Sequence, residues 1–100
     1  MSLKWLMTWD MIPGREQEYF EFLVREFVPG LQRLGVEPAE AWYTTYGDGP
    51  QMQAVFLAED VEVMRKAREG EDWVKLRERL FEFVTNFDSK VVKASGGFQL

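Results

Sequence analysis

The order of the periodic segments is the feature that most constrains this chain. Apolar and polar residues alternate, as in half-buried strands, over residues 4–12, 39–46 and 51–58, and a short β-branched run follows at 90–94. Apolar residues recur at helical spacing between the first and second of these segments, and again between the third and fourth. The order strand, helix, strand, strand, helix, strand predicts a four-stranded antiparallel sheet with both helices on one face.

The first predicted helix contains a proline. Glu16 and Glu18 lie in its first turn, where acidic groups suit the helix dipole. Pro29 removes a backbone donor and disfavours a helical Val28, so we expect a kink or a short break there. Gly35 is expected to end the helix as a left-handed cap. The apolar stripe is predicted to comprise Phe20, Leu23, Phe27, Leu31 and Leu34.

The second predicted helix begins after Asp60, a good N-cap residue, and is interrupted at Gly70. Glu71 and Asp72 restart it. A stripe at nearly heptad spacing then predicts helix as far as Phe87, with the last strand from Lys90 to Ala94. The stripe consists of Trp73, Leu76, Leu80, Phe83 and Phe87. Between the middle strands, residues 47–50 (Gly-Asp-Gly-Pro) predict a hairpin turn.

This element order, β-α-β-β-α-β, is that of the ferredoxin-like fold, in the α+β class. The 100 residues are enough for one domain, spanning 1–100. Neither Cys nor His occurs, which excludes a classical zinc site, a histidine general base and histidine ligation of haem. The net charge of −5 argues against nucleic-acid and anionic-membrane partners. No signal or membrane-spanning segment is evident, so we expect a cytoplasmic protein.

The two faces of the predicted sheet differ. One face of the first and third strands is almost wholly apolar and is expected to lie against the helices. The opposite face is mixed but carries Leu6, Val55 and Leu57, which a monomer would leave in water. We therefore predict a homodimer in which two sheets pack face to face. The alternative is a monomer that tolerates a few exposed apolar residues.

Two segments carry a resemblance to a known superfamily. Residues 12–19 (Ile-Pro-Gly-Arg-Glu-Gln-Glu-Tyr) resemble the strand-turn-helix opening of dimeric α+β barrel proteins. Glu71–Trp73, with Leu76, Leu80, Val84 and 89–92 (Ser-Lys-Val-Val), is similar to the end of NIPSNAP-like members. The resemblance implies two ferredoxin-like protomers that join their sheets, with a cleft between sheet and helices for a small apolar or aromatic molecule. Members of the superfamily include cofactor-independent monooxygenases similar to those of antibiotic biosynthesis, isomerases, haem-degrading enzymes and proteins without known activity.

Four residues are candidates for such a site. Trp9, Tyr43 and Trp73 would form the aromatic walls of a ligand cleft, although each is also a natural core or dimer-interface residue. Asp10, which follows Trp9 on the mixed strand face, would act as a base or orient a ligand if burial raised its pKa. The alternative for Asp10 is a solvated strand end or an ion pair across the dimer, with Arg15 or Lys93.

Two functions therefore stay open. The first is a protein that binds a small apolar or aromatic molecule without a cofactor or metal, with oxygenation or isomerisation as the activities that the resemblance implies. The second is a non-catalytic interaction module that acts through its dimer and whose own aromatic side chains fill the cleft. An RNA-recognition domain of the same topology is argued against by the third strand, which lacks the basic residue, glycine and paired aromatics of that class.

Overall fold

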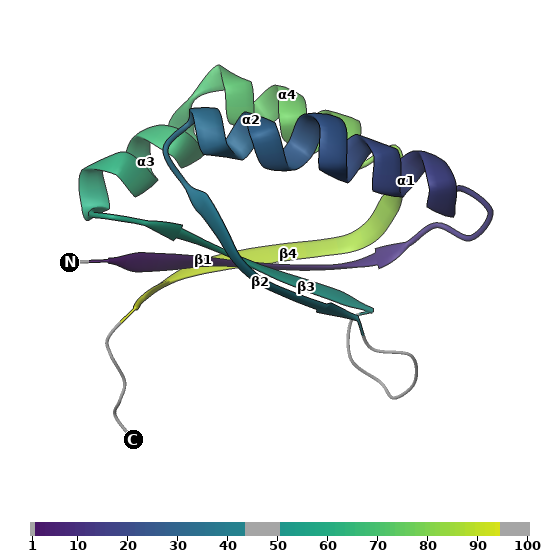
Figure 1. The fold of residues 1–100 in the computed structure, drawn as a ribbon, viewed down its shortest axis with the longest axis horizontal. Coiled ribbons are helices and arrows are strands. Elements are labelled where there is room, and N and C mark those ends of the chain that lie inside the picture. The colour runs from purple at the N-terminus through teal and green to yellow at the C-terminus, as the bar shows by residue number, and fades with distance from the viewer. Residues whose placement is uncertain (1, 44–50, 95–100) are drawn as a thin grey trace.

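A computed structural model describes residues 2–43 and 51–94 and shows the predicted layers. The sheet order is β2-β3-β1-β4, with every neighbouring pair antiparallel. The helices lie over one face of this sheet, and none of the described helices covers the opposite face, which we call the open face (Figure 1). This arrangement confirms the α+β class and the ferredoxin-like fold. The elements are β1 Leu3–Met11, α1 Glu16–Phe22, the π-helical turn η1 Leu23–Phe27, α2 Val28–Arg33, β2 Glu37–Tyr43, β3 Met52–Ala58, α3 Val61–Glu69, α4 Glu71–Leu80 and β4 Val84–Lys93.

The predicted helix ends are confirmed at three positions. Asp60 accepts a hydrogen bond from the Val63 backbone N–H at 2.9 Å and so caps α3. Gly70 is extended, with φ −82° and ψ 163°, and separates α3 from α4. Gly35 follows α2 with φ +98°, a left-handed conformation that glycine adopts without steric strain.

The core lies between the helices and the inner face of β1 and β3, as predicted. Trp5, Met7 and Trp9 on β1 are at most 1% exposed, and alternate residues of β3 are also buried. Trp73 on α4 meets Trp5 edge to face, with the ring centroids 4.6 Å apart. Large aromatic side chains thus supply much of the buried apolar area of this small domain.

The first helical arm, α1–η1–α2, corrects the predicted apolar stripe. Phe20, which we expected in the core, is 50% exposed. Tyr19 and Phe22 are buried instead, at 1% and 3% exposed. Beyond the π turn, Phe27 and Leu31 are buried as predicted. The stripe therefore changes phase within the arm.

The π turn accounts for this change of phase. An α-helix that buries Tyr19 and Phe22 would next turn residue 26, a glutamate, toward the core. In η1 the Val28 N–H instead bonds to the carbonyl five residues earlier, which adds one residue to the turn. Phe27 consequently takes the core position, and Glu26 stays at the surface, where it pairs with Arg79. The irregularity predicted at Pro29 is present, but it lies just before the proline, and the arm stays helical.

The end of the second helix is a further correction. We predicted helix to Phe87, but α4 ends at Leu80 and β4 begins at Val84. Phe83 is buried from the connecting turn, and Phe87 is half-buried on the strand, where it packs against the core. The heptad-like spacing continued past the helix because residues in three different conformations fill the same core.

The other strand limits differ by a few residues. The second strand, predicted over 39–46, is β2 Glu37–Tyr43, while the predicted limits of the first and third strands hold to within one residue. The hairpin predicted at 47–50 lies outside the described residues, as does the rest of the predicted second strand. No helix among the described residues is long and apolar enough to cross a bilayer.

The open face of the sheet carries the three apolar residues that we expected there. Leu6 pairs with Val55 across β1 and β3, and Leu57 pairs with Lys4. Leu6 and Leu57 are half-buried, but Val55 is only 2% exposed, contrary to the expectation that a single protomer would leave it in water. In the register, Val55 lies on an inner strand between Leu6 and Glu40.

Candidate functional site

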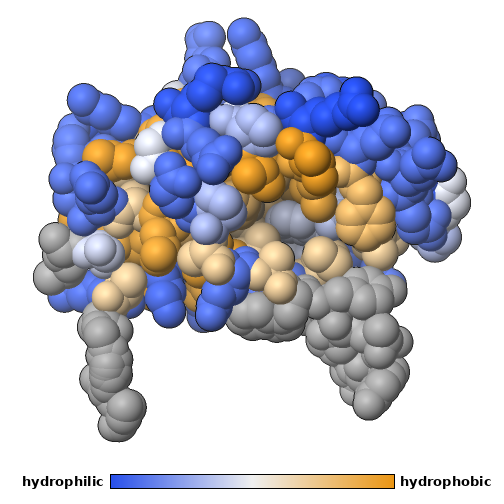
Figure 2. Space-filling view, in the orientation of Figure 1, coloured by the Kyte–Doolittle hydropathy of each residue, from blue (hydrophilic) through white to orange (hydrophobic). Residues whose placement is uncertain are grey.

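A cavity with a mainly apolar lining lies between the helical arm and the β2 side of the sheet. It has a volume of about 260 Å³. Ala41 lies directly opposite Ala54 in the register of β2 and β3, and these two small side chains leave room on the sheet side. Figure 2 shows apolar side chains in a band between the polar helix surface and the sheet. The lining residues are Trp9, Leu23, Phe27, Val28, Pro38, Ala39, Glu40, Ala41, Met52, Ala54 and Phe56.

The π turn forms the helical wall of this cavity. Leu23 and Val28, the two ends of a π hydrogen bond, both line the cavity together with Phe27. Residues five apart point to different sides of an α-helix, which has 3.6 residues per turn. The wider turn brings them to the same side. Single π turns are frequent at functional sites, so the π turn supports this cavity as a candidate site.

Trp9, one of the candidate wall residues, lies on the inner side of this cavity. Its Nε1–H donates a hydrogen bond to the Tyr19 hydroxyl at 2.8 Å, and both residues are 1% exposed. Phe87 stacks on the Trp9 ring at 6.1 Å, and Phe27 meets that ring edge-on at the same centroid distance. Since the indole N–H is already bonded to Tyr19, Trp9 would contact a ligand through the carbon atoms of its ring and not as a hydrogen-bond donor.

Tyr19 stays neutral behind this wall. Burial raises the pKa of its phenol to about 12, and the hydrogen bond from Trp9 opposes that rise. Tyr19 does not line the cavity, so its effect on the cavity passes through the orientation of Trp9.

The other two predicted wall residues have different positions. Trp73 is 4% exposed and packs within the core against Trp5, Phe27 and Phe87, and it is not among the residues that line the cavity. The backbone of Tyr43 pairs with Met52 at the end of β2, but its side chain lies outside the described part of the structure. Of the two candidate wall residues whose side chains the structure describes, Trp9 lines the cavity and Trp73 does not.

Asp10 joins three segments at one end of the sheet. One carboxylate oxygen accepts the Gln51 backbone N–H and the other accepts Nδ2 of Asn86, both at 2.9 Å. Gln51 in turn accepts the Met11 backbone N–H at 2.7 Å. The hydrogen bond from the Asn86 side chain, followed by the one from the Gln51 backbone, lowers the pKa of Asp10. The condition for a base, a pKa raised by burial, is thus not met.

A β-bulge in β4 creates this arrangement. Thr8 pairs with Asp88 and Asp10 pairs with Thr85, so the two residues Asn86 and Phe87 lie opposite Trp9 alone. Asn86 has a left-handed φ of 57°, which asparagine tolerates better than most residues. The bulge directs the Asn86 amide to Asp10 and places Phe87 on Trp9.

Sequence reasoning missed most of the cavity lining. The five-residue spacing from Phe22 to Phe27 was the available signal for the π turn, but a four-residue step from Leu23 fitted a regular helix equally well. The alanines of β2 and β3 did not predict the cavity. A small strand residue leaves a cavity only where the facing helix is too far from the sheet to fill the space, and the sequence does not give that distance.

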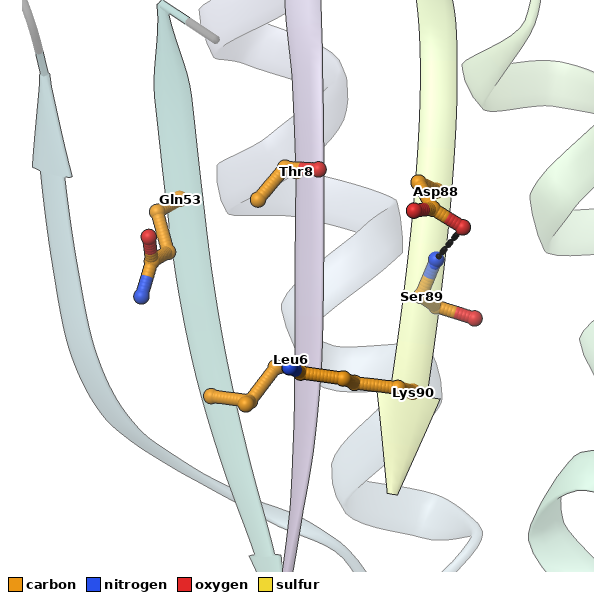
Figure 3. A pocket seen from close by; sticks show the side chains of 6 residues that line it. All are labelled: Leu6, Thr8, Gln53, Asp88, Ser89 and Lys90. Carbon is orange, nitrogen blue, oxygen red and sulfur yellow. Dashed lines mark hydrogen bonds between the residues drawn. The ribbon is translucent and has the colours of Figure 1, made fainter. Parts of the chain in front are cut away.

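A second hollow, of about 340 Å³, lies on the open face of the sheet. Figure 3 views this face with the helices behind the strands. Lys90 extends from β4 across β1 toward Leu6, and Asp88 lies two residues before it on the same strand (Figure 3). The hollow is lined by Leu6, Thr8, Gln53, Asp88, Ser89 and Lys90.

Solved structures share this fold at low sequence identity. A NIPSNAP family protein from Agrobacterium tumefaciens superimposes with a TM-score of 0.70 at 13% identity, covering 96% of this chain and 95% of that one. SnoaB, a cofactor-independent oxygenase from Streptomyces nogalater, gives 0.71 at 13% identity, with 96% and 95% covered. A dimeric protein of unknown function and ferredoxin-like fold from Bacteroides fragilis gives 0.59 at 9%, with 92% and 95% covered.

These comparisons show the fold. No family model matches the chain, and no curated protein matches its sequence. The predicted resemblance to NIPSNAP-like proteins and to cofactor-independent oxygenases is confirmed at the level of the ferredoxin-like architecture.

Proposed function

We propose that this protein binds a compact apolar or aromatic molecule in the cavity between η1, α2 and the inner face of the sheet. The observation that carries the proposal is the lining, in which Trp9, Phe27 and Phe56 surround a space left by alanines. A volume of about 260 Å³ lies just below the roughly 300–1,000 Å³ of pockets for drug-sized ligands, which suits one or two rings.

Binding is better supported than catalysis. A base must reach the reacting group, and Glu40 is the one ionisable residue among the lining residues that the structure describes. Glu40 pairs with Val55 in the register and so shares the open face of the sheet with it. Asp10, with its lowered pKa and two bonded oxygens, is better suited to holding β1, β3 and β4 together. The oxygenase activity of SnoaB is therefore a weaker guide to this chain than its fold.

We further propose that two copies pack their open sheet faces together. The structural neighbour from Bacteroides fragilis is described as dimeric. Leu6 and Leu57 are only half-buried in one protomer, and covering apolar area stabilises by about 25 cal/mol per Å². Most of the cavity lining comes from the helical arm and the inner face of the sheet, away from the proposed contact between the two open faces.

A cavity-filling variant tests the binding proposal. Ala54→Leu adds three carbons at the sheet side of the cavity, whereas Gln53→Leu places the same leucine side chain on the opposite face of the strand. Thermal shift and calorimetry with 1-naphthol, 1,4-naphthoquinone and decanoic acid would be run on both variants and the unmodified chain. We expect binding of at least one aromatic probe to survive Gln53→Leu and to be lost in Ala54→Leu.

Two results would contradict the proposal. If Ala54→Leu, shown to be folded by circular dichroism, binds the probe as well as the unmodified chain does, the ligand lies elsewhere. If a broad panel gives no binding at all while the chain is dimeric, the interaction-module function is favoured.

A further inference from the structure

Several charges lie on the open sheet face without an ion-pair partner among the described residues, and two of them, Asp88 and Lys90, line its hollow. Asp88 and Lys90 are both exposed and both line the hollow of Figure 3. In the register with β1, Asp88 lies beside Thr8 and Lys90 lies beside Leu6, so both share the face of these residues. Within the described part of the chain, the Asp88 carboxylate accepts only its neighbour's backbone N–H, that of Ser89 at 2.9 Å. No ion pair within the described residues includes either charge.

These charges restrict what can cover the face. A purely apolar occupant would bury a carboxylate and an ammonium without partners, which is strongly unfavourable. The occupant must therefore present a cation to Asp88 and an anion to Lys90, along with apolar groups for Leu6 and Leu57. A second copy of the same face offers all of these.

We propose that Asp88 of each protomer pairs with Lys90 of the other and that this reciprocal pairing selects the second copy as partner. The inference rests on the face-to-face dimer proposed above. In a two-fold interface, a contact from position 88 of one protomer to position 90 of its partner is accompanied by the symmetry-related contact from position 90 to position 88. Both charges on each protomer are then satisfied by one symmetry operation. Alternate positions of one strand, with the side chains on the same face, suit such an exchange.

A charge-exchange experiment tests the pairing. Asp88→Lys carries two positive charges at these positions and Lys90→Asp carries two negative ones, so each variant should repel its own copy. We expect the dissociation constant of each single variant, measured by sedimentation equilibrium, to rise at least about tenfold. An equimolar mixture should form a heterodimer in native mass spectrometry. The double variant Asp88→Lys with Lys90→Asp should again form a homodimer but should not exchange subunits with the unmodified chain.

Matched controls change the charge by the same amount on the other side of the molecule. Lys75→Asp and Glu78→Lys lie at exposed positions of α4 and should leave dimerisation unchanged. If either single variant at 88 or 90 dimerises like the unmodified chain, or if the mixture stays dissociated, the pairing is wrong although the dimer stands. If the unmodified chain is a monomer at high concentration, the proposed dimer fails and the pairing fails with it, whereas the proposed cavity function is unaffected.

Discussion

At the scale of the residue, the Trp9–Tyr19 pair decides the character of the cavity wall. A buried indole N–H without an acceptor is costly, and the Tyr19 hydroxyl satisfies it from outside the cavity. The pair thereby turns a residue with a polar atom into an apolar wall. Trp5 lacks such a partner, since its buried Nε1 has no hydrogen bond among the described residues.

The raised pKa of Tyr19 predicts a loss of stability at high pH. The phenol ionises near pH 10 in the unfolded chain and near 12 in the folded one, so its contribution is complete below pH 10 and is lost as the pH rises toward 12. We expect the free energy of unfolding to fall over this window by about 2 to 3 kcal/mol more than in Tyr19→Phe. Urea denaturation at stepped pH measures this difference.

The comparison with Tyr19→Phe removes the titration of lysines and other tyrosines, which both proteins share. Parallel pH profiles for the two proteins would show that Tyr19 ionises at the same pH in the folded and unfolded states. In that case burial would not shift its pKa as the structure indicates.

At the scale of the element, the π turn reconciles two halves of one helical arm. Tyr19 and Phe22 fix the phase of α1, while Phe27 and Leu31 fix the phase of the second half. One extra residue is needed between them, and the exposed Val24, at 71%, is a residue that contributes nothing to the core. Pro29 lies in the first turn of α2, where its missing N–H is tolerated better than in a helix interior.

Removing the extra residue is therefore expected to give a regular α-helix. Deleting Val24 leaves the buried residues at steps of three, four and four, and Pro29→Ala in the same chain removes the proline clash. Relative to Pro29→Ala alone, we expect the deletion to change the free energy of unfolding by less than about 1 kcal/mol. Urea denaturation gives this value, and near-ultraviolet circular dichroism reports whether the aromatic core is intact.

A deletion in α4 is the control. Lys75 is also exposed, but removing it rotates Trp73 away from Leu80, two residues that both lie in the core. This variant should lose more than about 3 kcal/mol or fail to fold. Equal losses from the two deletions would mean that η1 is not a one-residue insertion in an otherwise regular helix.

At the scale of the whole molecule, one sheet carries two proposed functions on its opposite faces. The inner face holds the cavity, and the open face holds the proposed dimer contact. Since strand residues alternate between faces, neighbouring positions such as 53 and 54 belong to different functions.

Separate faces predict separable defects. Leu57→Glu places a charge on the open face and should raise the dimer dissociation constant while the affinity for an aromatic probe stays the same. Ala54→Leu should lower the affinity for the probe while the dimer dissociation constant stays the same. Sedimentation equilibrium and calorimetry on each variant measure both quantities. A variant that loses both, while folded, would indicate that the cavity is complete only in the dimer.

The local alternation and spacing of residues were sufficient for the order of elements, the buried faces of β1 and β3, the cap at Asp60 and the break at Gly70, because each depends on neighbours in the chain. Tertiary packing decided what depends on neighbours from elsewhere. Phe83 and Phe87 continue a helical period but lie in a turn and a strand, since the core selects apolar volume whatever the backbone conformation. Likewise, Phe27 rather than Glu26 is buried, Asp10 has a lowered pKa and Trp9 meets the cavity, because partners far along the chain hold each of them.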